Sequence, residues 1–166
     1  MKTMHDLRRK EKEITDSAEI RAILTGTKYI TIAMCHNNEP YLVTLSHGYD
    51  QQKNVLYFHC APEGKKIVVL TTNDRVWGQA IMDYGYAGGK CDHLFASVHF
   101  RGRVSFVKDE AEKRWALETM IHQLESTPDI VMADQITAAS IAKVQIGRID
   151  LDYLSGKKSD KVIVTL

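Results

Sequence analysis

The sequence has few of the residues that mark specialised protein classes. Its 166 residues include three prolines and three cysteines, and no tract is of low complexity. An odd number of cysteines without a C-x-x-C pair argues against a disulfide scaffold. No apolar run approaches the ~18 residues of a membrane helix, and the start, MKTMHDLRRKEKEI, lacks the apolar centre of a secretory signal. We therefore expect a cytoplasmic protein with reduced thiols and no contact with a membrane.

The chain also lacks an excess of either charge. It contains 22 Lys and Arg residues against 21 Asp and Glu residues, a formal net charge of +1. Nucleic-acid-binding domains usually carry a strong basic patch, so we expect no nucleic acid among the partners. The composition, 44% apolar and 26% charged, is typical of a globular protein. This length suits one domain, which we assign to residues 1–166.

Hydrophobic periodicity predicts a mainly β protein with peripheral helices. The short runs YITIAM, YLVTLSHGY and NVLYFH are separated by the turn-forming segments HNNEP and DQQKN. Connections this short join antiparallel neighbours. Further strands are predicted at RVWGQAIM, VHFRGRVSF and IAKVQIGRIDL. We expect about six antiparallel strands that close into a barrel, because closure removes exposed sheet edges.

Several segments carry local predictions. Gly102 lies on the apolar face of VHFRGRVSF, where a glycine indicates a bulge or something packed against the backbone. The glycine-rich segment DYGYAGGKCDH (residues 83–93) is predicted to be a loop. Helices are expected to begin at the capping patterns DSAE and DEAE, and another of about two turns to follow APEGKK.

The segment HCAPEGKK (residues 59–66) is the most distinctive candidate site. If a helix begins at Pro62 or Glu63, its first amide groups lack partners at the positive end of the helix dipole. With Lys65 and Lys66 beside them, these donors would suit a phosphate monoester, and Gly64 would allow close approach. On spacing alone, an ordinary helix start with solvated lysines is the favoured explanation.

Other chemistry-bearing residues leave alternatives open. His47 and His59 lie late in consecutive predicted strands, where they could approach each other or be ordinary hydrogen-bonded histidines. Cys60 could be an activated thiol beside the lysines or a buried cysteine. Ser46 and His47 face opposite sides of a strand and no G-x-S-x-G elbow exists, which excludes a serine hydrolase. No H-E-x-x-H or repeated Cys/His spacing predicts a metal site.

Taken together, these segments resemble the FMN-binding split barrel. They are most similar to its nitroimidazole-resistance (Nim-type) branch, whose members are relatives of pyridoxamine 5′-phosphate oxidase. The resemblance extends over about residues 8–158 and rests on RRKEKEI, EPYLVTLSHGYD, NVLYFHCAPEGKK, NDRVWGQ, FASVHFRGRVSFVKD and DYLSGKKSD. Each segment is weakly specific, but their combination at this spacing is specific. Thr44 replaces a proline that the family carries in the second strand.

The resemblance implies an antiparallel six-stranded split β-barrel and a homodimer with two FMN sites at the subunit interface. Three places in the sequence match cofactor-binding residues of the family. They are the strand beside the isoalloxazine ring, the phosphate-binding turn, and a position where the oxidase branch has a ring-contacting glutamine. The strand corresponds to Thr44, Leu45 and Ser46. The phosphate-binding turn corresponds to His59, Cys60, Ala61, Lys65 and Lys66, and the glutamine position corresponds to Ser97.

The resemblance also implies an activity. His47 matches a histidine that lies near the flavin in Nim-type proteins and is proposed to take part in substrate chemistry, so it is the predicted catalytic residue. We expect an FMN-dependent reductase of a small organic, nitroaromatic-like acceptor. Two alternatives are a flavin-sequestering protein without fast turnover and a haem-binding barrel with His47, His59 or His93 as axial ligand. Pyridoxamine phosphate oxidation is disfavoured, because the terminal SGKKSDK differs from the substrate-binding end of that oxidase.

Overall fold

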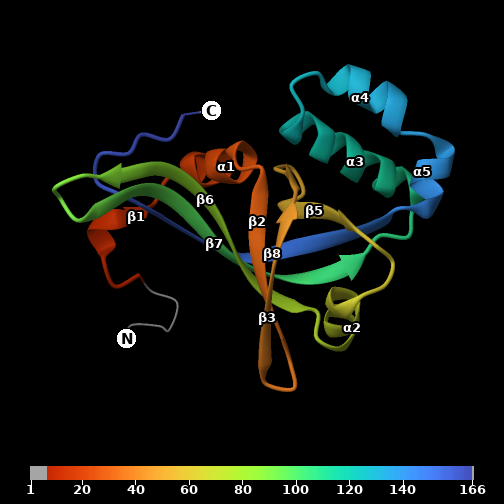
Figure 1. The fold of residues 1–166 in the computed structure, drawn as a ribbon, viewed down its shortest axis with the longest axis horizontal. Helices are drawn as coiled ribbons and strands as arrows, with labels where there is room; N and C mark the ends of the chain where they lie inside the picture. Colours follow the sequence, from red (N-terminus) through yellow and green to blue (C-terminus); the bar gives the residue numbers. More distant parts are fainter. Residues whose placement is uncertain (1–6, 166) are drawn as a thin grey trace.

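The computed structural model describes residues 7–165 and consists of one antiparallel sheet with helices around it (Figure 1). The strands are β1 Glu13–Ile14, β2 Tyr29–His36, β3 Glu39–Ser46, β4 Gly48–Asp50, β5 Val55–Cys60, β6 Arg75–Ala87, β7 Asp92–Phe106 and β8 Gln145–Lys158. The helices are the 3-10 turn Lys10–Lys12, α1 Ser17–Gly26, α2 Lys65–Thr72, α3 Glu110–Leu124, α4 Pro128–Gln135 and α5 Ala138–Lys143.

The strands follow the order β3-β2-β6-β7-β8-β5-β4, and β1 pairs separately with β8. Every pairing is antiparallel, as the short connections predicted. The sheet has eight strands rather than six, because β1 and β4 contain only two and three residues. Elements this short are below the length at which periodicity distinguishes a strand from a turn.

The prediction of a closed barrel needs a correction. Within residues 7–165 the ladder ends at β3 on one side and at β4 on the other, and no backbone pairing joins the two ends. Side chains fill the seam instead: Tyr41, Val43 and Leu45 of β3 pack against the same core as Leu56 and Phe58 of β5. The sheet therefore curls around a shared core while the outer backbone edge of β3 stays free.

Two apolar clusters hold the elements together. The larger fills the inside of the curled sheet and includes Ile30, Ile32, Val98, Phe100 and other fully buried residues. The smaller lies on the opposite face of β5 and β8, which α3 covers. There Ala116 and Met120 of α3 pack against Val55 and Tyr57 of β5 and Ile146 of β8. No helix in the described part of the chain is long and apolar enough to span a bilayer.

Most local predictions agree with the structure, with two exceptions. Asp16 caps α1 by accepting from the amide of Ala18 at 2.8 Å, and Asp109 caps α3 by accepting from that of Glu112 at 2.8 Å. The predicted loop over residues 83–93 is wrong, because β6 continues to Ala87 and β7 starts at Asp92. Its glycines serve a β-bulge and a tight turn instead. The last strand also starts later and ends later than predicted, at Gln145–Lys158.

Gly102 confirms the prediction of a bulge and of close packing. The pairing of β7 with β8 shifts register between Arg101 and Gly102, which leaves Asp152 as the extra residue of β8. A β-carbon on Gly102 would lie 2.5 Å from the carbonyl oxygen of Asp150. Because that neighbour is backbone inside a ladder, it has little freedom to move away.

We expect Gly102→Ala to lower the free energy of unfolding by about 1–3 kcal/mol, the usual cost of overpacking a closely packed site. Gly88→Ala is the matched control, because a β-carbon there meets nothing within 4 Å and Gly88 has no positive φ. Urea unfolding of both variants measures the difference. An equal effect of the two substitutions would contradict the packing seen around Gly102.

Candidate functional site

The start of α2 presents unpaired amide groups, as the segment HCAPEGKK led us to expect. The helix begins at Lys65, two residues later than predicted, and Gly64 precedes it with φ 123°. That backbone conformation favours glycine. The carbonyl of Gly64 accepts from the amides of Ile67 at 3.0 Å and Val68 at 3.2 Å. The amides of Lys65 and Lys66 lie in the first turn, where a helix offers them no acceptor.

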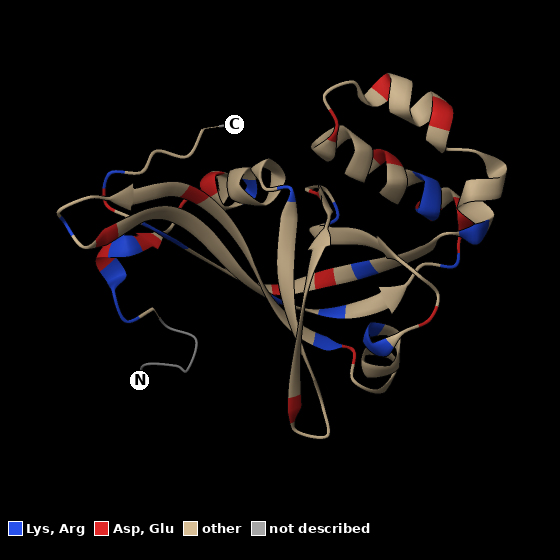
Figure 2. Cartoon of the chain, viewed as in Figure 1, with Lys and Arg blue, Asp and Glu red and all other residues tan. Residues whose placement is uncertain are grey.

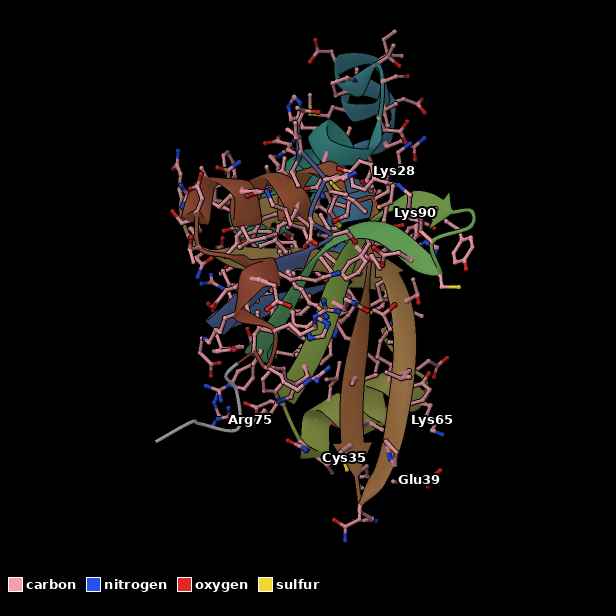
Figure 3. The ribbon with its side chains drawn as sticks, turned by 90° about the vertical axis from the view of Figure 1, so that its left-hand side faces the viewer. Lys28, Cys35, Glu39, Lys65, Arg75 and Lys90 are labelled. Atoms are coloured by element: carbon pink, nitrogen blue, oxygen red, sulfur yellow. The ribbon has the colours of Figure 1, made fainter. Side chains whose placement is uncertain are left out.

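Two lysine side chains stand over aromatic rings beside these amides. The Lys65 ammonium lies 4.6 Å from the ring centre of Tyr41 on β3, and the Lys66 ammonium lies 5.6 Å from that of Phe58 on β5. In residues 7–165 neither lysine forms an ion pair. Figure 2 marks this positive charge on α2, and Figure 3 shows Lys65 beside β3. These amides and ammonium groups are the donors that the predicted phosphate site requires.

The residues preceding the turn differ in their access to solvent. His59 and Ala61 are exposed, while Cys60 is half-buried and packs against the main core. Burial raises the pKa of the Cys60 thiol, and the nearby Lys66 charge opposes this only in part. Between the two readings of Cys60, the structure favours a protonated, structural thiol.

The strand β3 lies next to this turn and forms the free edge of the sheet. Its side chains alternate, with Thr44 and Ser46 exposed on the outer face and Leu45 packed against the core. The Thr44 hydroxyl lies 3.0 Å from that of Thr31 on β2. Because β3 pairs only with β2, the backbone groups on its other edge can bond to a ligand. Tyr41, under Lys65, connects this edge to the start of α2.

Ser97 lies away from these residues in a single chain. It is buried on β7 and donates to the carbonyl of Lys157 at 3.4 Å. Two strands, β2 and β6, separate β7 from β3, a span of about 14 Å at the usual strand spacing. One chain therefore brings the β3 and α2 residues together but does not bring Ser97 to them.

His47, the predicted catalytic residue, is fully buried at the bend between β3 and β4. Its Nε2 lies 2.9 Å from the carbonyl oxygen of Leu24 at the end of α1, and 3.1 Å from the side-chain amide nitrogen of Gln123 on α3. Within residues 7–165 its Nδ1 has no hydrogen-bond partner. No hydrogen bond joins His47 to His59 in the described part of the chain. Within one chain, His47 connects α1 and α3 to the end of β3 through these contacts. Its catalytic role stays a prediction.

Gln123 completes this buried contact and was not found from the sequence. Its amide nitrogen donates to the carbonyls of Leu24 at 3.1 Å and Thr27 at 2.7 Å, and its oxygen accepts from the amide of Tyr49 at 2.9 Å. A glutamine in an ordinary helix has no sequence signal that distinguishes this role. Residues 7–165 contain no group of three or more His, Cys, Asp or Glu side chains placed to bind a metal ion.

Comparison with known proteins identifies the family. The chain belongs to the pyridoxamine 5′-phosphate oxidase family, whose model matches residues 16–158. A candidate 5-nitroimidazole antibiotic resistance protein from Bacteroides thetaiotaomicron is 25% identical, with a TM-score of 0.74, over 87% of this chain and 85% of that one. A search of the curated proteins found no match.

Two further solved structures share the fold at lower identity. The flavocytochrome Anf3 from Azotobacter vinelandii is 19% identical, with a TM-score of 0.77, over 93% of this chain and 72% of that one. A FAD-binding protein from Mesorhizobium loti is 23% identical, with a TM-score of 0.62, over 87% of this chain and 96% of that one. The mainly β fold with peripheral helices is therefore the one that the resemblance implied, while the closure of the barrel is not seen in residues 7–165.

The burial of His47 generates a prediction about stability and pH. Desolvation lowers the pKa of His47 from 6.5 to about 4. Between these values the unfolded chain binds a proton that the folded chain excludes, so this stability is complete above pH 6.5 and is lost as the pH falls through 4. We expect wild type to lose about 2–3 kcal/mol more than His47→Gln between pH 7 and pH 4.5. Urea unfolding at both pH values measures this difference.

His122→Gln is the control for this measurement, because His122 is an exposed histidine on α3. It should retain the pH dependence of wild type. If His47→Gln retained the pH dependence of wild type as well, the conclusion that His47 is buried and neutral in the folded protein would be contradicted.

Proposed function

We propose that this protein is a homodimeric FMN-binding oxidoreductase that reduces a small organic, nitroaromatic-like acceptor. The observation that carries the proposal is the start of α2, where free amides and two unpaired lysines lie beside the free edge of β3. Membership of the pyridoxamine 5′-phosphate oxidase family supports a flavin phosphate as the anion. The likeness to the Bacteroides protein supports the nitroaromatic acceptor. Bound FMN would supply the redox chemistry, since no side chain of the site can accept an electron pair reversibly.

The residues of the site fit FMN in two parts. The amides and ammonium groups of Lys65 and Lys66 would hold the phosphate, and the φ of Gly64 lets the turn present those amides. Among the described residues, nothing lies within 4 Å of the position of a β-carbon on Gly64, so the space beside this glycine is open. The free edge of β3 at Thr44 and Ser46 would hydrogen-bond the polar rim of the ring system and orient it.

The proposed homodimer would form through the outer face of β2, β3 and β6. This face exposes Tyr29, Leu42 and Ile81, whose relative exposures are 55%, 63% and 40%. Figure 2 shows that β2 and β3 carry no charged residue other than Glu39 at the hairpin tip. Large apolar side chains exposed on one face of a sheet favour an interface there. A partner on this face would bring a second chain to the edge of β3, completing a site that one chain leaves open.

The absorbance spectrum of the purified protein tests which cofactor is bound. Flavin bands are expected. A Soret band would instead favour the haem alternative, which is suggested by the names of the Azotobacter flavocytochrome and of a FAD and haem binding protein from Mycobacterium smegmatis.

The double variant Lys65→Ala with Lys66→Ala tests the phosphate site. It should weaken the binding of FMN at least tenfold and that of riboflavin little, because charge-assisted hydrogen bonds to the phosphate are lost. Equilibrium binding of both ligands measures this.

Lys108→Ala is the matched control, an exposed lysine outside the site. Equal loss of FMN and riboflavin affinity in the double variant would contradict the phosphate assignment. Bound FMN that remains oxidised with reduced nicotinamide, and that does not pass electrons to a nitroaromatic compound after chemical reduction, would instead favour the flavin-sequestering alternative.

A second prediction concerns the dimer. Leu42→Asp places a charge in the middle of the proposed interface, where it would be desolvated without a partner. We expect this variant to sediment as a monomer and to lose FMN affinity together with dimerisation. Ile130→Asp is the control, because Ile130 is 71% exposed on α4, outside the interface. A wild-type monomer that retains FMN would overturn the interfacial site.

A further inference from the structure

A cavity of about 340 Å³ lies between α1 and the start of β5, where neither the predicted phosphate site nor the proposed dimer reaches. The residues that line it come from α1, β4, the turn after β4, and β8; they include Ser17, Ile20, Arg21, Tyr49, Asn54 and Leu154. We call this group the α1 pocket. None of its lining residues belongs to β2, β3 or β6, whose outer face would form the dimer.

The α1 pocket is also separate from the predicted phosphate site. Asn54 immediately precedes β5, whereas Lys65 and Lys66 come after the turn at the other end of that strand. The strand from Asn54 to Cys60 spans about 20 Å at the usual rise per residue. A ligand in the α1 pocket would therefore not compete with a phosphate bound at the start of α2.

One face of α1 forms a wall of the pocket and supplies part of its apolar floor. Ser17, Ile20 and Arg21 are spaced three and four residues apart, so they share one face of the helix. Ile20 packs against the main core, and Leu154 of β8 does the same. These two side chains give the pocket an apolar surface that a ring or a short hydrocarbon chain can cover.

Arg21 brings a positive charge to the pocket without a counterion. The residue is half-buried, and within residues 7–165 its guanidinium forms no ion pair and no hydrogen bond. Arginine does not lose its charge in proteins, and a charge that is partly removed from water is costly without a partner. Among the described residues, no carboxylate lines the pocket.

The nearby carboxylates are bound to other groups. Asp50 accepts from two backbone amides of the following turn and from the indole nitrogen of Trp115 at 2.7 Å. Glu19, on α1 itself, forms an ion pair with Lys158 of β8. The charge of Arg21 is therefore available to a ligand that enters the pocket.

A buried hydroxyl group lies beside this charge. Tyr49 is only 6% exposed, and its hydroxyl donates to the side-chain oxygen of Asn54 at 2.9 Å. Burial raises the pKa of Tyr49, and the positive charge of Arg21 opposes this only in part. The hydroxyl is therefore protonated at neutral pH and can rotate to donate to an anion.

We propose that the α1 pocket binds a small organic monocarboxylate with an aromatic or other apolar body. The carboxylate would accept two parallel hydrogen bonds from the guanidinium of Arg21, whose fork matches its geometry, and one from the hydroxyl of Tyr49. The body would cover Ile20 and Leu154. A single cation favours one negative charge over the two of a phosphate monoester, and the volume, at the lower end for small-molecule sites, favours one ring. This site is additional to the proposed function.

Calorimetric titration of the purified protein with benzoate tests the proposal. We expect saturable binding. Benzamide has the same ring without the charge, and acetate has the charge without the ring. Each should bind at least tenfold more weakly than benzoate, because one loses the charge-assisted hydrogen bonds and the other the apolar contact.

Two substitutions test the assigned contacts. Arg21→Gln should weaken benzoate at least tenfold, and Tyr49→Phe about three- to tenfold, because the first removes a charged donor and the second a neutral one. Arg114→Gln is the matched control, because Arg114 is an exposed arginine on α3 outside the pocket. It should leave the affinity unchanged.

Amide chemical shifts in nuclear magnetic resonance spectra locate the ligand without using activity. Benzoate should shift the signals of Ser17 and Asn54 and leave those of Lys65 and Lys66 in place. The double variant Lys65→Ala with Lys66→Ala should retain wild-type benzoate affinity. Loss of benzoate binding in this variant would mean that the anion binds at the start of α2 and would overturn the proposal.

Two other results would also overturn it: benzoate binding that does not saturate, and equal effects of Arg21→Gln and Arg114→Gln. Failure of the proposed function gives a different result. A protein that binds no flavin but still binds benzoate with the same dependence on Arg21 would contradict the proposed function alone.

Discussion

The candidate site depends on the one-sided pairing of β3. A strand in the middle of a sheet has no backbone groups to offer a ligand, and a closed barrel has no edge at all. Here the ladder stops at β3, while Tyr41, Val43 and Leu45 still bury their side chains in the core shared with β5. Side-chain packing thus holds the seam closed to solvent and leaves the backbone edge free. The start of α2 meets this edge, because Lys65 stands over Tyr41.

The faces of the sheet separate two kinds of recognition. The first turn of α2 carries two positive charges, whereas β2 and β3 carry no charged residue up to Glu39 at the hairpin tip (Figure 2). An ion such as a phosphate is held by charge and free amides, and an uncharged ring by apolar walls and neutral hydrogen-bonding groups. In the proposed enzyme the first turn of α2 would therefore select the phosphate of the cofactor.

The sequence predicted much of the fold but less of the site. Alternation in VHFRGRVSF and the caps at Asp16 and Asp109 are local signals, and each agrees with the structure. The open seam is a property of the whole sheet: it depends on which strands meet after the chain curls, and no local pattern contains that information. For the same reason Ala33 and Trp77 become neighbours only through strand register.

His47 shows how a resemblance can identify a position without determining its environment. The residue was predicted to line a pocket, yet in one chain it is buried between α1, α3 and the end of β3. A neutral histidine here can donate to the carbonyl of Leu24 near the end of α1 without bringing a charge into the interior. A lysine would add an ammonium group with nothing to neutralise it, at a cost of several kcal/mol. The need for a neutral donor at that point is enough to account for a histidine.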